Sequence, residues 1–169
     1  MVIAPGSKPL LFALFDILEG DVLLPRPSWV SYEPQVEHAR KKLFWVETDE
    51  HDRHTISCNK SDSSSCKQCT KMLCKVESLE ATYQRAIRAN ASPRIMLVNS
   101  PSNPTGQVFS RTVVDTIARF CRDKGITLIS DEIYSDLCFN AGDVGISAFR
   151  SNPINSAPVV MTGGLSKVS

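Results

Sequence analysis

Short apolar runs alternate with segments of helical periodicity along most of this chain, and this alternation restricts the folds that it can adopt. The spacing predicts helices over residues 7–19, about 29–40, 79–89 and 112–124, and strands over residues 21–25, 43–46, 94–98, 126–129 and 159–161. Strands that are apolar throughout are typical of a parallel sheet buried on both faces. We therefore predict an α/β fold with three layers, α/β/α, around a mostly parallel sheet.

Length and charge narrow the class of protein further. The 169 residues, 42% of them apolar, suit one domain over residues 1–169. With 19 basic and 18 acidic residues, the net charge of +1 argues against nucleic acid or a membrane surface as a partner. No apolar run approaches the roughly 18 residues that span a bilayer, and residues 1–9 do not resemble a signal peptide. We expect a cytoplasmic protein that acts on small molecules.

Residues from about 49 to 75 interrupt the alternation with a polar stretch rich in Asp, His, Ser, Lys and Cys. We interpret this stretch as a surface loop inserted into the domain. It contains four of the six cysteines, Cys58, Cys66, Cys69 and Cys74, which we expect to be reduced thiols because no secretory leader is evident. A zinc site would need chelating spacing, which only Cys66 and Cys69 have, so no metal site is predicted.

Three polar motifs come directly after predicted strands. Residues 99–106 (NSPSNPTG) follow the third strand, residues 131–134 (DEIY) follow the fourth, and residues 165–167 (LSK) follow the fifth. Each motif alone also has a structural interpretation, as a stiff turn, a helix cap or a surface lysine. Open parallel sheets bind ligands beyond the carboxyl ends of their strands, so the three motifs together predict one site.

In this order and spacing, the three motifs resemble those of the class I/II aminotransferases of the aspartate aminotransferase superfamily. Two upstream segments extend the resemblance. Gly6-Ser7-Lys8, which opens the first predicted helix, resembles the phosphate-binding turn of the family. Residues 25–32 (PRPSWVSY) resemble the stretch whose aromatic residue stacks on the cofactor, with Trp29 in that position.

The resemblance implies transamination with pyridoxal 5'-phosphate (PLP) as the cofactor. Lys167 would form a Schiff base with PLP and later transfer a proton, and Asp131 would pair with the pyridine nitrogen. Asn103 and Tyr134 would donate hydrogen bonds to the phenolate oxygen, and Trp29 would cover one face of the ring. Lys167, Asp131 and Tyr134 are the implied catalytic residues. The implied cofactor contacts are Gly6, Ser7, Lys8, Trp29, Asn103, Asp131, Tyr134, Ser166 and Lys167.

The resemblance also implies an amino acid and a 2-oxo acid as substrates, and a homodimer for the full-length protein. Members of the family have further segments on both sides of these residues, including arginines for the cofactor phosphate and the substrate carboxylate after the lysine, so the resemblance implies that residues 1–169 form part of a PLP-binding large domain. Gly164 stands where a serine is often found. Two other functions stay open, a lyase resembling the 1-aminocyclopropane-1-carboxylate synthases and a truncated, non-catalytic remnant that binds PLP. The identity of the amino acid stays open too.

Overall fold

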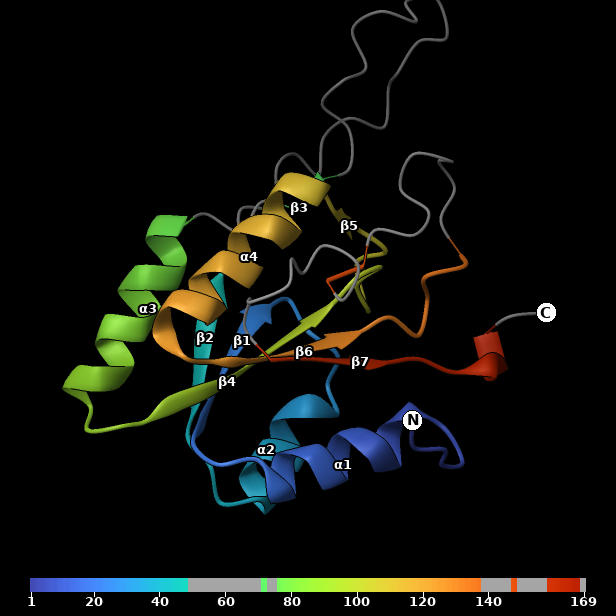
Figure 1. The fold of residues 1–169 in the computed structure, drawn as a ribbon, viewed down its shortest axis with the longest axis horizontal. Helices are drawn as coiled ribbons and strands as arrows, with labels where there is room; N and C mark the ends of the chain where they lie inside the picture. Colours follow the sequence, from blue (N-terminus) through green and yellow to red (C-terminus); the bar gives the residue numbers. More distant parts are fainter. Residues whose placement is uncertain (49–70, 73–75, 138–146, 149–157, 168–169) are drawn as a thin grey trace, which may run out of the picture.

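A five-stranded parallel sheet forms the centre of the computed structural model, which describes residues 1–48, 71–72, 76–137, 147–148 and 158–167 (Figure 1). Its strands lie in the order β2-β1-β4-β6-β7, and all four neighbouring pairs are parallel. Their bounds are β1 (Asp21–Arg26), β2 (Leu43–Glu47), β4 (Pro93–Asn99), β6 (Thr127–Asp131) and β7 (Val159–Thr162). The predicted parallel α/β fold is confirmed.

Helices cover both faces of this sheet. Helices α1 (Ser7–Ile17) and α2 (Tyr32–His38) lie on one face, and α3 (Val76–Arg88) and α4 (Arg111–Lys124) lie on the other (Figure 1). Successive residues of a strand point to opposite faces, so Val22 and Leu24 of β1 pack with α1 and α2, whereas Leu23 packs beneath α4. Both faces are buried, which explains why the strands are apolar throughout.

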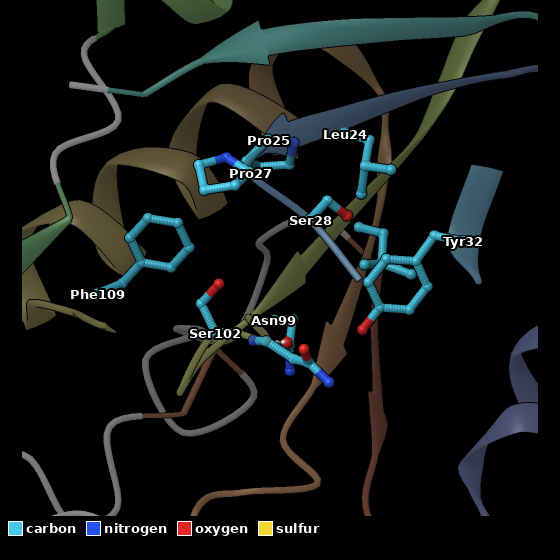
Figure 2. Close-up of a pocket in the computed structure, with 10 residues that line it drawn as sticks. Leu24, Pro25, Pro27, Ser28, Tyr32, Asn99, Ser102 and Phe109 are labelled. Atoms are coloured by element: carbon cyan, nitrogen blue, oxygen red, sulfur yellow. Dashed lines mark hydrogen bonds between the residues drawn. The ribbon is translucent and has the colours of Figure 1, made fainter. Parts of the chain in front are cut away.

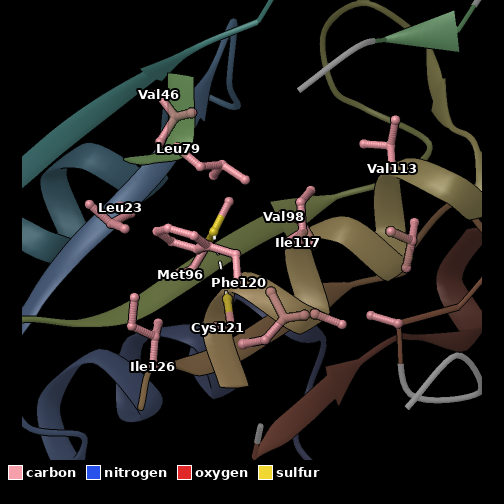
Figure 3. Close-up of a cluster of buried hydrophobic side chains, with 14 of the residues drawn as sticks. Leu23, Val46, Leu79, Met96, Val98, Val113, Ile117, Phe120, Cys121 and Ile126 are labelled. Carbon is pink, nitrogen blue, oxygen red and sulfur yellow. Dashed lines mark hydrogen bonds between the residues drawn. The ribbon is translucent and has the colours of Figure 1, made fainter. Parts of the chain in front are cut away.

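The apolar face of α4 meets the sheet closely. Ile117, Phe120 and Cys121 point from the helix toward Met96 of β4, and the Cys121 and Met96 sulfur atoms lie 3.8 Å apart (Figure 3). The helix begins after Ser110, whose hydroxyl accepts a hydrogen bond from the helix, and ends at a left-handed glycine. These signals explain why the predicted bounds of α4 lie within one residue of the observed ones.

Several elements differ from the prediction. Helix α2 begins at Tyr32 rather than near residue 29, because residues 29–31 form a turn before it. Two pairs of residues, β3 (Lys71–Met72) and β5 (Val108–Phe109), form a second parallel sheet, and a two-residue strand has no periodicity to detect. A short 3-10 helix, η2 (Leu165–Lys167), follows β7.

The predicted insert from about 49 to 75 lies outside the described residues, apart from the two residues of β3. Its four cysteines, Cys58, Cys66, Cys69 and Cys74, lie outside them as well. Within the part of the chain that the structure describes, no group of three potential metal ligands comes together. None of the helices described is long and apolar enough to cross a bilayer.

Candidate active site

A cavity of about 430 Å³ opens where β4, β6 and β7 reach their carboxyl ends. The nine residues predicted to contact a cofactor all line it, although they come from five separate segments of the chain. Three further residues complete its wall. The lining residues are Gly6, Ser7, Lys8, Trp29, Tyr32, Asn99, Asn103, Asp131, Ile133, Tyr134, Ser166 and Lys167.

The Asp131 carboxylate is the buried charge of this cavity. Asp131 ends β6 on the face covered by α1 and α2, and only 2% of its surface is exposed. The Tyr32 hydroxyl donates to Oδ2 at 2.7 Å, and the Thr162 hydroxyl donates to Oδ1 at 3.0 Å. Burial raises the pKa of Asp131 above its ordinary value, and both hydrogen bonds oppose that rise. A cationic partner beside Asp131 would therefore lower this pKa again and favour the ionised carboxylate.

Tyr32 is suited to act as a donor to this carboxylate. Its side chain is 1% exposed, and burial together with the neighbouring Asp131 raises the pKa of the phenol well above its ordinary value. The hydroxyl therefore stays protonated over the physiological range. The Trp29 ring meets the Tyr32 ring edge to face, with 5.3 Å between ring centroids, which orients both rings at the cavity wall.

Tyr134 links two other predicted site residues. The Asn103 side-chain amide donates to the Tyr134 hydroxyl at 3.3 Å. The Lys167 Nζ lies 6.0 Å from the centroid of the Tyr134 ring. Lys167 is exposed at the end of η2, and Tyr134 is half-buried. The lysine amine therefore lies near Tyr134, one of the residues with which the sequence grouped it.

The amino end of α1 forms another part of the wall. Gly6 precedes the helix with φ of 102°, a backbone conformation that favours glycine, and the helix has neither a side-chain cap nor an acidic residue in its first turn. Lys8 adds a positive charge there, with its Nζ 5.6 Å from the Trp29 ring centroid. Backbone N–H groups, the helix dipole and an ammonium group together favour an anion such as a phosphate.

Tyr32, Thr162 and Asn99 were not predicted as site residues. Tyr32 lies three positions after Trp29, and Asn99 follows an apolar strand, as the predicted residues do, so both had a detectable signal. Thr162 had none, because its contact depends on β7 lying beside β6, where Asp131 and Thr162 are register partners.

One cavity on the parallel sheet is surrounded by a helix N-terminus open to an anion, the face of an aromatic ring, a buried carboxylate and a lysine. These features define an α/β protein with a site suited to a phosphorylated aromatic cofactor. The model of the family described as aminotransferase class I and II matches residues 1–168, and the chain belongs to this family. The cofactor of the family is PLP.

Individual relatives agree with this assignment. The chain is 29% identical over 170 residues to aspartate aminotransferase of Geobacillus stearothermophilus, covering 99% of this chain and 37% of that protein. The structure of aspartate aminotransferase from Thermus thermophilus with maleate is 28% identical and superposes with a TM-score of 0.69, covering 96% of this chain and 36% of that one. A shorter match, 41% identical over 68 residues, covers 40% of this chain and 14% of 1-aminocyclopropane-1-carboxylate synthase 6 from Arabidopsis thaliana. The chain thus spans just over a third of the length of the two aspartate aminotransferases.

Proposed function

We propose that this chain is the PLP-binding core of an aminotransferase, which transfers an amino group from an amino acid to a 2-oxo acid. One observation supports this proposal above the others. The buried Asp131 carboxylate and the Lys167 amine line the same cavity, together with a ring and an anion-binding helix end. PLP has a chemical counterpart for each of them, namely a ring nitrogen, an aldehyde, an aromatic face and a phosphate.

The cavity residues would bind PLP by several contacts. The N–H groups at the start of α1 and the Lys8 ammonium would receive the phosphate. Asp131 would face the protonated ring nitrogen, whose positive charge would lower the raised pKa of this carboxyl and keep it ionised. Asn103 and Tyr134 would donate hydrogen bonds to the phenolate oxygen, and Trp29 would cover one face of the ring.

When bound, PLP supplies an electron-withdrawing ring that stabilises negative charge on the substrate α-carbon. Lys167 would hold PLP covalently through its amine until the substrate amine replaces it. The released amine of Lys167 would then take the proton from the substrate α-carbon. It would deliver this proton to the C4′ carbon of the cofactor. Asp131 would keep the ring nitrogen protonated throughout, with Tyr32 and Thr162 holding its two oxygens in place.

Aspartate is the first amino donor to test, because two of the relatives described above are aspartate aminotransferases. A homodimer of the complete protein and a cytoplasmic location belong to the same proposal. The match to a 1-aminocyclopropane-1-carboxylate synthase supports a second candidate, a PLP-dependent lyase. Both enzymes would use the same cofactor contacts, so the products formed from the amino acid distinguish them.

The experiment is a titration of the 169-residue chain with PLP, followed by visible absorbance. Saturable binding with the absorbance of lysine-bound PLP is expected for the wild type and for Lys42→Ala, whose amine lies near the carbonyls of residues 89 and 90 at the opposite end of the sheet. Lys167→Ala should lose that absorbance. Absorbance that persists in Lys167→Ala would refute the role of this lysine, and the absence of saturable binding would refute PLP binding by this chain.

Turnover then separates the candidate activities. Amino transfer from aspartate that requires an added 2-oxo acid supports the aminotransferase. Elimination products formed without an oxo acid support the lyase. Saturable PLP binding with neither kind of product would support the non-catalytic remnant.

A further inference from the structure

Asn99 connects two residues of the candidate site through its side-chain amide. It is the last residue of β4 and is 9% exposed. Its Nδ2 donates to the Asp131 carbonyl oxygen at 2.9 Å, and its Oδ1 accepts from the Asn103 backbone N–H at 2.8 Å. One planar amide therefore joins the end of β6 to the loop that carries Asn103.

The position of Asn99 in the sheet explains why this connection matters. The ladder between β4 and β6 ends at the pair Asn99 and Asp131. Beyond this pair, the Ser100 N–H reaches the Asp131 carbonyl oxygen only at 3.3 Å. The Asn99 amide therefore provides the shorter link between the two strand ends at this point, and it extends the ladder into the loop.

A second, small cavity lies behind Asn99 (Figure 2). Its volume is about 10 Å³, enough for about one water molecule. Leu24, Pro25 and Pro27 lie on one side of it, and Asn99 and Ser102 lie on the other. Asn99 lines both this cavity and the candidate active site. The space behind the amide is too small for a longer side chain, which would have to extend into the larger cavity, whereas a shorter one would not reach the Asn103 N–H.

We propose that Asn99 is a positioning residue that fixes Asn103 relative to Asp131. The proposal rests on the proposed function, in which Asn103 faces the phenolate oxygen of PLP and Asp131 faces the ring nitrogen. These two atoms belong to one rigid ring, so both protein groups must keep a fixed separation to bind it. An asparagine provides an N–H donor and a carbonyl acceptor at the required reach, whereas an ionised aspartate of the same size provides acceptors only.

Two substitutions separate the two hydrogen bonds of Asn99. Asn99→Asp keeps an acceptor for the Asn103 N–H but loses the donor to the Asp131 carbonyl oxygen. Asn99→Ala loses both partners. Phe109→Leu is the matched control, because Phe109 lines the small cavity and is buried but its side chain bonds to neither residue. It should loosen the packing of the same region without removing the connection.

The first measurement needs no cofactor. Hydrogen exchange of the Asn103 amide, followed by NMR in the 169-residue chain, should speed up by about fivefold or more in Asn99→Ala, as expected for loss of one hydrogen bond. In Asn99→Asp and in Phe109→Leu, the exchange rate of this amide should stay near that of the wild type. An unchanged rate in Asn99→Ala would overturn the proposal.

The second measurement is the dissociation constant of PLP, taken from the absorbance titration. Asn99→Ala should weaken PLP binding by about tenfold, as expected for two lost hydrogen bonds, and Asn99→Asp by less. Phe109→Leu should lower the unfolding midpoint but leave the PLP affinity unchanged. PLP affinity that is the same in Asn99→Ala as in the wild type would refute the positioning role. If the wild type itself fails to bind PLP, the proposed function fails, and the exchange experiment still decides whether Asn99 holds the loop.

Discussion

Replacing Tyr32 by Phe should destabilise the protein, and the loss should be larger at neutral pH than at acidic pH. The substitution keeps the buried ring and removes one hydroxyl, which donates to Asp131 at 2.7 Å. A hydrogen bond to a charged partner contributes about 1.5–3 kcal/mol, and one to a neutral partner contributes about 1 kcal/mol. We therefore expect a loss of about 2 kcal/mol where Asp131 is ionised and about 1 kcal/mol where it is protonated.

The direction of the pH dependence follows from the pKa of Asp131. Burial raises this pKa above its ordinary value of 3.8, so the folded protein binds the proton of the Asp131 carboxyl more tightly than the unfolded chain does. The stability contributed by that proton is complete below the unfolded pKa and is lost as the pH rises through the folded pKa. Without the Tyr32 hydroxyl the folded pKa rises further, so the difference between variant and wild type grows as the pH increases.

Urea unfolding of both proteins over a pH series, from about pH 4, near the ordinary pKa of the carboxyl, to about pH 8, measures this effect as a difference in unfolding free energy. The control is the same substitution in an Asp131→Asn background, where no carboxyl titrates and the loss should not change with pH. A loss that stays equal across this series in the wild-type background would refute the reasoning. So would a pH dependence that persists in Asp131→Asn.

Three further predictions concern stability and are measured by urea unfolding. Gly20→Ala should cost at least about 2 kcal/mol, because φ is +92° and the added Cβ would lie 2.4 Å from the Arg94 Cβ. Gly106→Ala should cost only about 1 kcal/mol, because φ is +69° but the space around it is open. Equal losses for the two variants would contradict this account. Asp21→Ala should cost about 2 kcal/mol, because the carboxylate accepts two backbone N–H groups at 2.7 and 2.8 Å, and an unchanged midpoint would count against that account. Ser110→Ala should cost only about 0.5 kcal/mol, because the capping hydrogen bond of α4 is long at 3.4 Å, and a loss above about 1.5 kcal/mol would show that the cap is stronger than its length indicates.

The residues that the sequence predicted for the site share one property, which is that each lies at or within a few residues of the end of a helix or strand. Asp131 ends a strand and Gly6 precedes a helix, so the expected position of the ends was enough to group them. The order of the strands was not predicted. The contact between Thr162 and Asp131 depends on that order, which no local pattern contains.

One further difference has a local cause. The predicted helix near residue 29 begins at Tyr32, because Pro27 and the turn after it delay the helix. Asn99 had been placed in the polar motif that follows the third predicted strand, with no role of its own. Its side chain accepts the Asn103 N–H within that motif, but its other hydrogen bond reaches a residue 32 positions away. A sequence pattern detects the first kind of contact and not the second.

The contacts of Asp131 have a consequence for the time at which the site forms. Tyr32 lies 99 positions before Asp131 in the chain, and Thr162 lies 31 positions after it. Contacts of such separation form slowly, because a long loop must close before they contribute free energy. During synthesis, Lys167 also emerges after almost all of the described residues. The complete cavity can form only once β7 has joined the sheet beside β6, so capture of the cofactor by all of these residues would follow the pairing of these two strands.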